Sequence, residues 1–219
     1  MAIKDAKNGL KNLDAESKAL ITLLIFGIKK FYKQDSEALF GHGDSPRHID
    51  ERAMVGCIYR YMYQGLAKRC VNFSHIDIEY NRMLGLKTDG IEKAIVPCEK
   101  CKREGASSVC IAKDGVFQQW LTDLRSQKDY KGIRPDIIVH NRNQLNQFSN
   151  GLIVEFKKLD GDLTYDEQKV RYATCHRSPL HYIVGAVVRL QQKNAEVDVY
   201  QDGKPKCKFL VSQHGLGND

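Results

Sequence analysis

The sequence predicts a mixed α/β protein in which helices flank a central β-sheet. Two helical patterns come first, over residues 14–33 and 48–68. Three short runs with strand character follow, near residues 71–82, 134–139 and 151–158. A further helix and strand come next, and this order of elements is typical of a single domain built in layers around one sheet.

Composition and charge describe a globular protein with a polyanionic partner. The 219 residues suffice for one substantial core, and 42% hydrophobic with 28% charged residues is ordinary for a globular chain. The net charge of +7 favours nucleic acid, because lysine and arginine release counterions from phosphates. Seven cysteines, an odd number, and a start without secretory character favour a reducing, cytoplasmic location. The apolar run 19–28 is too short to span a membrane, so we expect a buried helix there and no membrane segment.

The first two helices are expected to form the packing layer. Asp14 is a plausible N-cap for the first of them, which belongs to an N-terminal helical segment over residues 1–44. In the second helix Glu51 shares one face with apolar residues and should point inward. A carboxylate on an inward face needs a partner. Glu51 is alternatively a helix-start residue favoured by the macrodipole.

The other side of the second helix is basic and aromatic. Tyr59 and Tyr63 lie among four basic residues: Arg52, Arg60, Lys68 and Arg69. This side is either a phosphate-contacting surface or an ordinary solvated basic face, and the sequence leaves both interpretations open.

The strands at 134–139 and 151–158 hold the most informative residues. Side chains alternate along a strand, which places Glu155 and Lys157 on one face and Phe156 on the other. If the two strands pair, Asp136 comes close to Glu155. Like charges are costly to bury together unless a cation lies between them, so the simplest explanation is a divalent metal held by Asp136, Glu155 and a backbone carbonyl. A surface hairpin with a Glu/Lys pair is the alternative.

Pro135-Asp136 and Glu155-Phe156-Lys157 together resemble the two halves of the PD-(D/E)xK nuclease motif. The resemblance covers residues 48–190 and implies a restriction-endonuclease-like core that hydrolyses nucleic acid, with DNA as the expected substrate. It also implies Mg²⁺ or Mn²⁺ held by a set of four residues and faced by Lys157 as the catalytic ammonium. The metal-holding set is Glu51, Asp136, Glu155 and, through its carbonyl, Phe156.

Three further positions are candidates by the same resemblance. An acidic residue on the first strand, Glu79, could stand near the metal, and an exposed strand residue is the alternative. The helix after the Glu-x-Lys strand often supplies a polar or basic residue in this superfamily, which here corresponds to Gln168 or Lys169. Solvated helix residues are the alternative for both.

Residues 83–131 form an insertion in the predicted core. Cys98 and Cys101 have the spacing of half a structural zinc site, and Cys110 could be a third ligand. The fourth ligand is not evident; Cys70, Cys207 or a histidine would have to supply it. Three reduced cysteines in a polar loop are the alternative. A short amphipathic helix is expected at 115–126.

The C-terminal part of the chain is predicted to be a helix followed by strands. Thr164 and Glu167 form a capping box at the start of that helix. A buried strand at 182–190 precedes a hairpin that turns at Asp202-Gly203, and the tail from residue 215 is expected to be loose.

The sequence therefore predicts one nuclease-like domain over residues 1–219 that cleaves phosphodiester bonds with a bound metal. Two other functions compete with it: a nucleic-acid-binding module of the same fold without catalysis, and a zinc-stapled adaptor protein. Retention of Asp136, Glu155 and Lys157 together argues against loss of catalysis. Duplex DNA, single-stranded DNA and RNA remain open as substrates.

Overall fold

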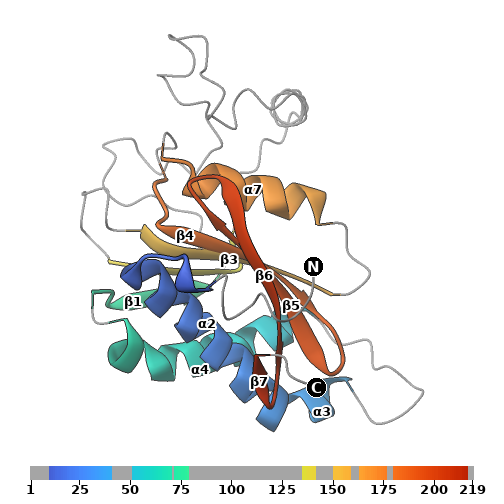
Figure 1. Cartoon of the computed structure of the whole chain (residues 1–219). Coiled ribbons are helices and arrows are strands. Elements are labelled where there is room, and N and C mark those ends of the chain that lie inside the picture. The colour runs from blue at the N-terminus through green and yellow to red at the C-terminus, as the bar shows by residue number, and fades with distance from the viewer. Residues whose placement is uncertain are drawn as a thin grey trace, which may run out of the picture.

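The computed structural model describes residues 10–40, 51–70, 72–78, 135–141, 150–158, 163–176 and 180–216. These ranges hold one seven-stranded sheet whose strands lie side by side in sequence order. Helices cover both of its faces, α2 and α4 on one and α7 on the other (Figure 1). The strands are β1 (His75–Ile78), β2 (Ile137–His140), β3 (Asn150–Lys158), β4 (Val184–Leu190), β5 (Asn194–Gln201), β6 (Lys204–Ser212) and β7 (Gly215–Leu216). The helices are α2 (Ala15–Gln34), α3 (Ser36–Phe40), α4 (Glu51–Arg69) and α7 (Thr164–Thr174).

The sheet is mixed, as the sequence predicts. β3 and β4 pair in parallel, and every other neighbouring pair is antiparallel. A parallel pair needs a crossover, and α7 supplies it between β3 and β4. The mixed α/β class with flanking helices is thus confirmed; the assignment to a restriction-endonuclease-like core stays a proposal.

One face of the sheet packs on α2 and α4. Alternate strand residues, among them Val154 and Phe156, join the hydrophobic core that these helices complete. On α4 the predicted inward residues Val55, Ile58 and Met62 are buried. α2 begins where the sequence indicates, because an Asp14 side-chain oxygen accepts the Ser17 N–H at 2.8 Å.

The other face of the sheet packs on α7, and β4 carries a glycine under that helix. A Cβ at Gly185 would lie 2.4 Å from Val170 Cγ1 and 2.9 Å from Thr174 Cγ2. The absent side chain therefore lets α7 approach the strands closely. This approach brings the start of α7 to the end of β3.

Two predictions about local structure are wrong. The capping box is misplaced, because the N-cap of α7 is Leu163 and Thr164 is the first residue of the helix. Leu163 is buried, and its carbonyl accepts the Glu167 N–H at 2.8 Å. The tail is not wholly loose, because Gly215 and Leu216 form β7 against β6.

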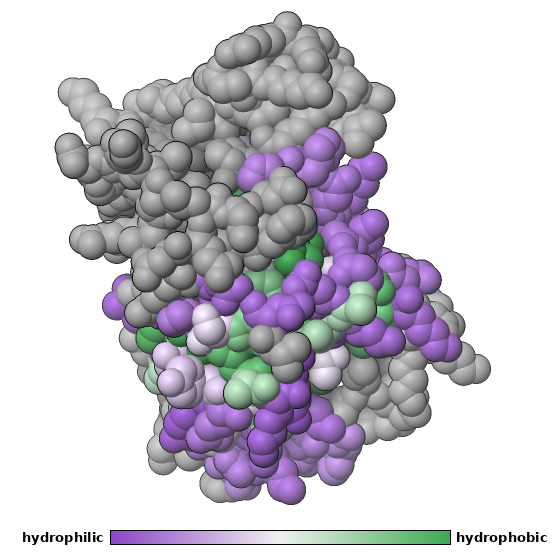
Figure 2. All heavy atoms as spheres, turned by 90° about the vertical axis from the view of Figure 1, so that its left-hand side faces the viewer, coloured by the Kyte–Doolittle hydropathy of each residue, from purple (hydrophilic) through white to green (hydrophobic). Residues whose placement is uncertain are grey.

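Several predictions lie outside the described residues. They are the insertion at 83–131 with its cysteines and helix, and Glu79. Among the described helices, none combines the length and apolarity that crossing a membrane requires. In the described part of the face shown in Figure 2, hydrophobic residues gather across the middle, between hydrophilic residues above and below them.

Two helix glycines provide a test of this packing. A Cβ at Gly27 of α2 would lie 2.5 Å from Met62 Cγ and 3.1 Å from the Ile58 carbonyl oxygen. A Cβ at Gly56 of α4 would meet no atom within 4 Å in the part of the chain that the structure describes. Gly27→Ala should lower the free energy of unfolding by about 1–3 kcal/mol through overpacking. Gly56→Ala should raise it by about 1 kcal/mol, because alanine is the better helix former. Urea unfolding of both variants measures the difference, and equal effects would contradict the described α2–α4 contact.

Candidate active site at the end of β3

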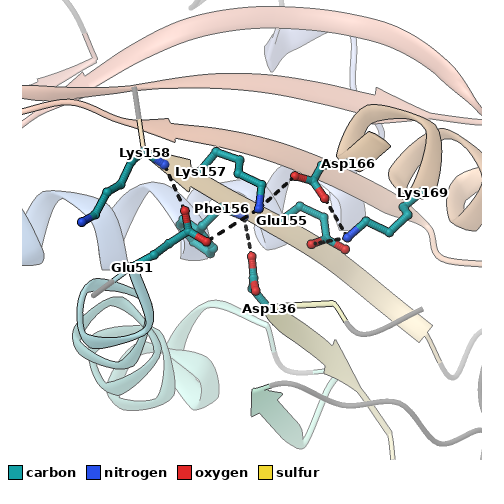
Figure 3. A network of polar contacts seen from close by, with 8 residues as sticks. All are labelled: Glu51, Asp136, Glu155, Phe156, Lys157, Lys158, Asp166 and Lys169. Atoms are coloured by element: carbon teal, nitrogen blue, oxygen red, sulfur yellow. Dashed lines mark hydrogen bonds and ion pairs between the residues drawn. The ribbon is translucent and has the colours of Figure 1, made fainter. Parts of the chain in front are cut away.

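The site is built where β3 continues beyond its neighbour β2. The pairing of β2 with β3 ends at Ile137 opposite Val154, so among the described residues no strand pairs with the last residues of β3 on that side. The N–H and C=O of one strand residue point to the same side, and residues two apart point alike. Two carboxylates occupy the vacated side: Asp136 Oδ2 accepts the Phe156 N–H at 2.7 Å, and Glu51 Oε2 accepts the Lys158 N–H at 3.1 Å (Figure 3).

Asp136 lies directly before β2. When the β2–β3 register is extended by one residue beyond Ile137 and Val154, Asp136 faces Glu155. The adjacency predicted from the sequence is therefore present. Burial raises the pKa of Asp136 to about 6, although the Phe156 N–H, Lys169 and Lys157 all favour its charged form. The neighbouring Glu51 adds to the rise.

Glu155 points to the opposite face of β3 from Phe156 and meets α7. Its Oε2 lies 2.9 Å from Lys169 Nζ, and the same ammonium lies 2.7 Å from Asp166 Oδ1. Burial raises the pKa of Glu155 well above its ordinary value, and Lys169 offsets only part of that effect. The other oxygen, Glu155 Oε1, is buried and has no hydrogen-bond partner among the described residues.

The Lys157 side chain lies between Glu51 of α4 and Asp166 of α7. Its Nζ lies 3.4 Å from Asp166 Oδ2 and 3.8 Å from Glu51 Oε1, and about a third of the side chain (33%) is exposed. Burial disfavours its charge, but Asp166 and Glu51 outweigh burial and raise the pKa of Lys157. The ammonium is thus held charged while it remains accessible to a ligand.

The arrangement concentrates negative charge. Four carboxylates face two ammonium groups, so full ionisation leaves an excess of two negative charges. That excess equals the charge of one divalent cation. The carboxylates come from four separate parts of the chain: Glu51 from α4, Asp136 from before β2, Glu155 from β3 and Asp166 from α7.

The structure brings together most of the residues singled out in the sequence. Glu51, Asp136, Glu155, Lys157 and Lys169 share one network, and the Phe156 backbone belongs to it. Gln168 is buried, but its Oε1 has no hydrogen-bond partner among the described residues.

Sequence reasoning missed Asp166, which is 2% exposed and pairs with both lysines. Its three-residue spacing from Lys169 on a helix was the available signal.

The proposed zinc ligands of the insertion lie outside the described residues. Two of the candidates for the fourth ligand do not. Cys70 and Cys207 are buried in the hydrophobic core, and burial raises the pKa of each thiol to about 11. Zinc binds the thiolate, so both are poor candidates.

The donor atoms of the network fit a hard cation in kind. Carboxylate and carbonyl oxygens suit Mg²⁺ or Mn²⁺, and the buried oxygen Glu155 Oε1 lacks a partner. As they stand, however, no three His, Cys, Asp or Glu side chains of the described residues are arranged to hold an ion. Lys169 and the Phe156 N–H engage oxygens that a metal would use.

The raised pKa of Asp136 generates a stability test. Between the ordinary value of 3.8 and about 6 the folded state binds more protons at this group than the unfolded state, so stability falls as the pH rises through that window and stays lower above it. Asp136→Asn removes this cost and keeps an oxygen that can accept the Phe156 N–H. In chelator at neutral pH the variant should melt above the wild type, and the difference should shrink as the pH approaches 4. A lower melting temperature of the variant at neutral pH would show that the carboxylate stabilises the fold.

No family model matches this chain, and neither a curated protein nor a solved structure matches it at a significant level.

Proposed function

We propose that this protein is a metal-dependent nuclease that hydrolyses phosphodiester bonds of nucleic acid, with DNA as the expected substrate. One observation carries the proposal: Asp136, Glu155 and Lys157 converge at the end of β3, where burial raises the pKa of both carboxyls. A purely structural ion pair needs no such excess of buried acid, whereas perturbed carboxyls beside an accessible ammonium are typical of catalytic sites. The resemblance to the PD-(D/E)xK superfamily supports the same chemistry.

Mg²⁺ or Mn²⁺ would be held by Asp136, Glu155 and the Phe156 carbonyl, with Glu51 directly or through water. The Phe156 carbonyl points to the same side of β3 as its N–H, which Asp136 accepts, so it is directed toward that carboxylate. When bound, the ion supplies charge neutralisation for the phosphate and lowers the pKa of an attacking water.

The protein residues have separable roles in this proposal. Lys157 places its ammonium beside the reacting phosphate, where it orients water or stabilises the charge that develops on phosphorus. Lys169 holds the Glu155 carboxylate against α7 and is a positioning residue. Because cation binding requires ionised Asp136, cleavage should rise as the pH increases through about 6.

One observation favours a second candidate function, a nucleic-acid-binding module of the same fold without catalysis. Backbone N–H groups and two lysines already occupy much of the hydrogen-bonding capacity of the carboxylates. Calorimetric titration with Mg²⁺ and Mn²⁺ distinguishes the two candidates, because the nuclease must bind one of these ions and the module need not.

Two variants test the nuclease proposal. Asp136→Asn removes the anionic charge that holds a hard cation, and Lys157→Ala removes the ammonium but keeps the carboxylates. Both should lose cleavage of plasmid, single-stranded DNA or RNA by roughly a hundredfold or more. Asp136→Asn should also weaken metal binding in calorimetry, whereas Lys157→Ala should not.

The chain offers matched controls for both changes. Asp198 on β5 is another half-buried carboxyl whose pKa burial raises, and Lys208 on β6 is a lysine paired with two carboxylates, Glu196 and Asp198. Asp198→Asn and Lys208→Ala should cleave as the wild type does. Normal cleavage by Asp136→Asn or Lys157→Ala would place catalysis elsewhere.

The cysteines of the insertion lead to a separate proposal, a structural zinc held by Cys98, Cys101 and Cys110. Purified protein should retain zinc near one per chain after mild chelation, as elemental analysis would show. Cys98→Ser should lose this zinc, while the half-buried Cys57→Ser on α4 should retain it. Protein without zinc would refute the proposal.

A further inference from the structure

The outward face of α4 differs from an ordinary solvated helix face. Residues at positions 52, 56, 59 and 63 follow one another at helical spacing, and they are Arg52, Gly56, Tyr59 and Tyr63. None of them is fully buried. We call these four residues, with the neighbouring exposed Arg60, the α4 outer face.

Two tyrosine rings lie together on this face. Their centroids are 6.2 Å apart and the ring planes are inclined by 35°. Tyr59 is partly packed on the core, while Tyr63 is 61% exposed, the highest value among the large hydrophobic residues that the structure describes as exposed. The open ring of Tyr63, held beside the anchored ring of Tyr59, offers an aromatic face to a planar ligand.

A glycine lies among these side chains without a packing reason. A Cβ at Gly27 or Gly65 would come within 3 Å of atoms across the α2–α4 contact, so those glycines are required by the fold. Gly56 has no atom of the described residues within 4 Å of a Cβ position, although glycine costs helix stability relative to alanine. An outward glycine bares the helix backbone between Arg52 and the tyrosines, which permits close approach of a ligand.

The charge of α4 identifies the kind of ligand. Glu51 is its one acid and belongs to the candidate active site, whereas the helix has four bases. Arg60 contacts Asp35 at 3.0 Å and donates to the Tyr61 hydroxyl at 2.7 Å. Its side chain is nevertheless 55% exposed, so that the guanidinium can also meet a phosphate. Two of the four bases, Arg52 and Arg60, belong to the α4 outer face; the other two, Lys68 and Arg69, are in the last turn of the helix, where Arg69 lies over the Phe26 ring of α2.

Basic side chains interleaved with open aromatic rings match a single-stranded nucleic acid. Phosphates would meet the arginines, and unpaired bases would stack on the tyrosines. A duplex hides the faces of its bases within the stack, so it cannot use the rings in this way. Single-stranded DNA and single-stranded RNA both offer unpaired bases on a phosphate backbone, so either could make these contacts with the α4 outer face.

We infer that the α4 outer face binds an unpaired stretch of the substrate strand that leads into the active site at the end of β3. The inference rests on the proposed nuclease function. Glu51 is the first residue of α4, so the face and the site share one rigid helix. At about 1.5 Å of rise per residue, Tyr59 and Tyr63 lie about 12 and 18 Å along the helix from Glu51.

Fluorescence anisotropy in chelator tests this inference without cleavage. The probes are labelled oligothymidine, labelled oligouridine and a mixed-sequence DNA duplex of the same length. Tyr63→Ala should weaken binding of a single-stranded probe by roughly fivefold to a hundredfold, the range of one lost stacking contact, and should leave duplex binding nearly unchanged. Gln64→Ala, an exposed neighbour outside the face, is the matched control and should bind as the wild type does.

Gly56→Ala gives a second, independent readout. A structural role for this glycine predicts that alanine lowers stability, whereas the inference predicts a raised melting temperature together with weaker single-strand binding. If Tyr63→Ala weakens binding of oligothymidine alone, the bound strand is DNA; if it weakens binding of oligouridine alone, the strand is RNA. Either result supports the inference. Unchanged single-strand binding by Tyr63→Ala, or an equal loss for the duplex, would overturn it.

The failure of this inference can be told apart from the failure of the proposed function. A protein that cleaves with Mg²⁺ and whose Tyr63→Ala variant binds single strands normally has the activity but not this binding face. A protein that never cleaves, yet binds single strands through Tyr63, has the face without the activity. Wild-type protein that binds no single-stranded probe would overturn the inference directly.

Discussion

The backbone of β3 beyond the end of β2 sets the central constraint of this structure. Buried N–H groups must find acceptors, and the last residues of β3 extend past the strand that would supply them. Asp136 and Glu51 fulfil this need for Phe156 and Lys158. The same geometry that completes the sheet therefore draws two carboxylates from distant parts of the sequence to one place. The hydrogen bonds that satisfy the backbone N–H groups of β3 are therefore the same contacts that assemble the acidic site.

Assembling these acids has an electrostatic cost. Asp136 and Glu155 resist ionisation because they are buried. Lys169 offsets part of this cost for both carboxyls, and Lys157 does so for Asp136. A protein under selection for stability alone would gain by replacing one acid with an amide. An acidic cluster whose carboxyl pKa values burial raises, in an otherwise well-packed sheet, fits the general trade of stability for function, in which a bound cation or ligand supplies the missing charge.

The sequence was informative where a local pattern of residues determines the structure. Alternation along a strand is enough to separate Glu155 from Phe156, and an Asp ahead of a helical pattern is enough to locate the start of α2. It was uninformative where tertiary packing decides. Asp166 in a first helical turn looks like a macrodipole acid. Its spacing places it beside Lys169 on the same helix, but only the docking of α7 against the sheet brings it to Lys157. The same docking buries Leu163, which takes the N-cap position that the capping-box pattern assigns to Thr164.

α4 links the core, the site and the outer face mechanically. Its inward face locks against α2 at Gly27 and Gly65, where no Cβ fits without displacing neighbours. Its first residue, Glu51, reaches the end of β3. Because the helix is rigid along its length, a shift in the α2–α4 contact would move the Glu51 carboxylate relative to Lys158 and Lys157 by a similar amount. Packing in the core thus determines how closely the acids approach, and a strand bound along the outer face would meet a site whose geometry is already set.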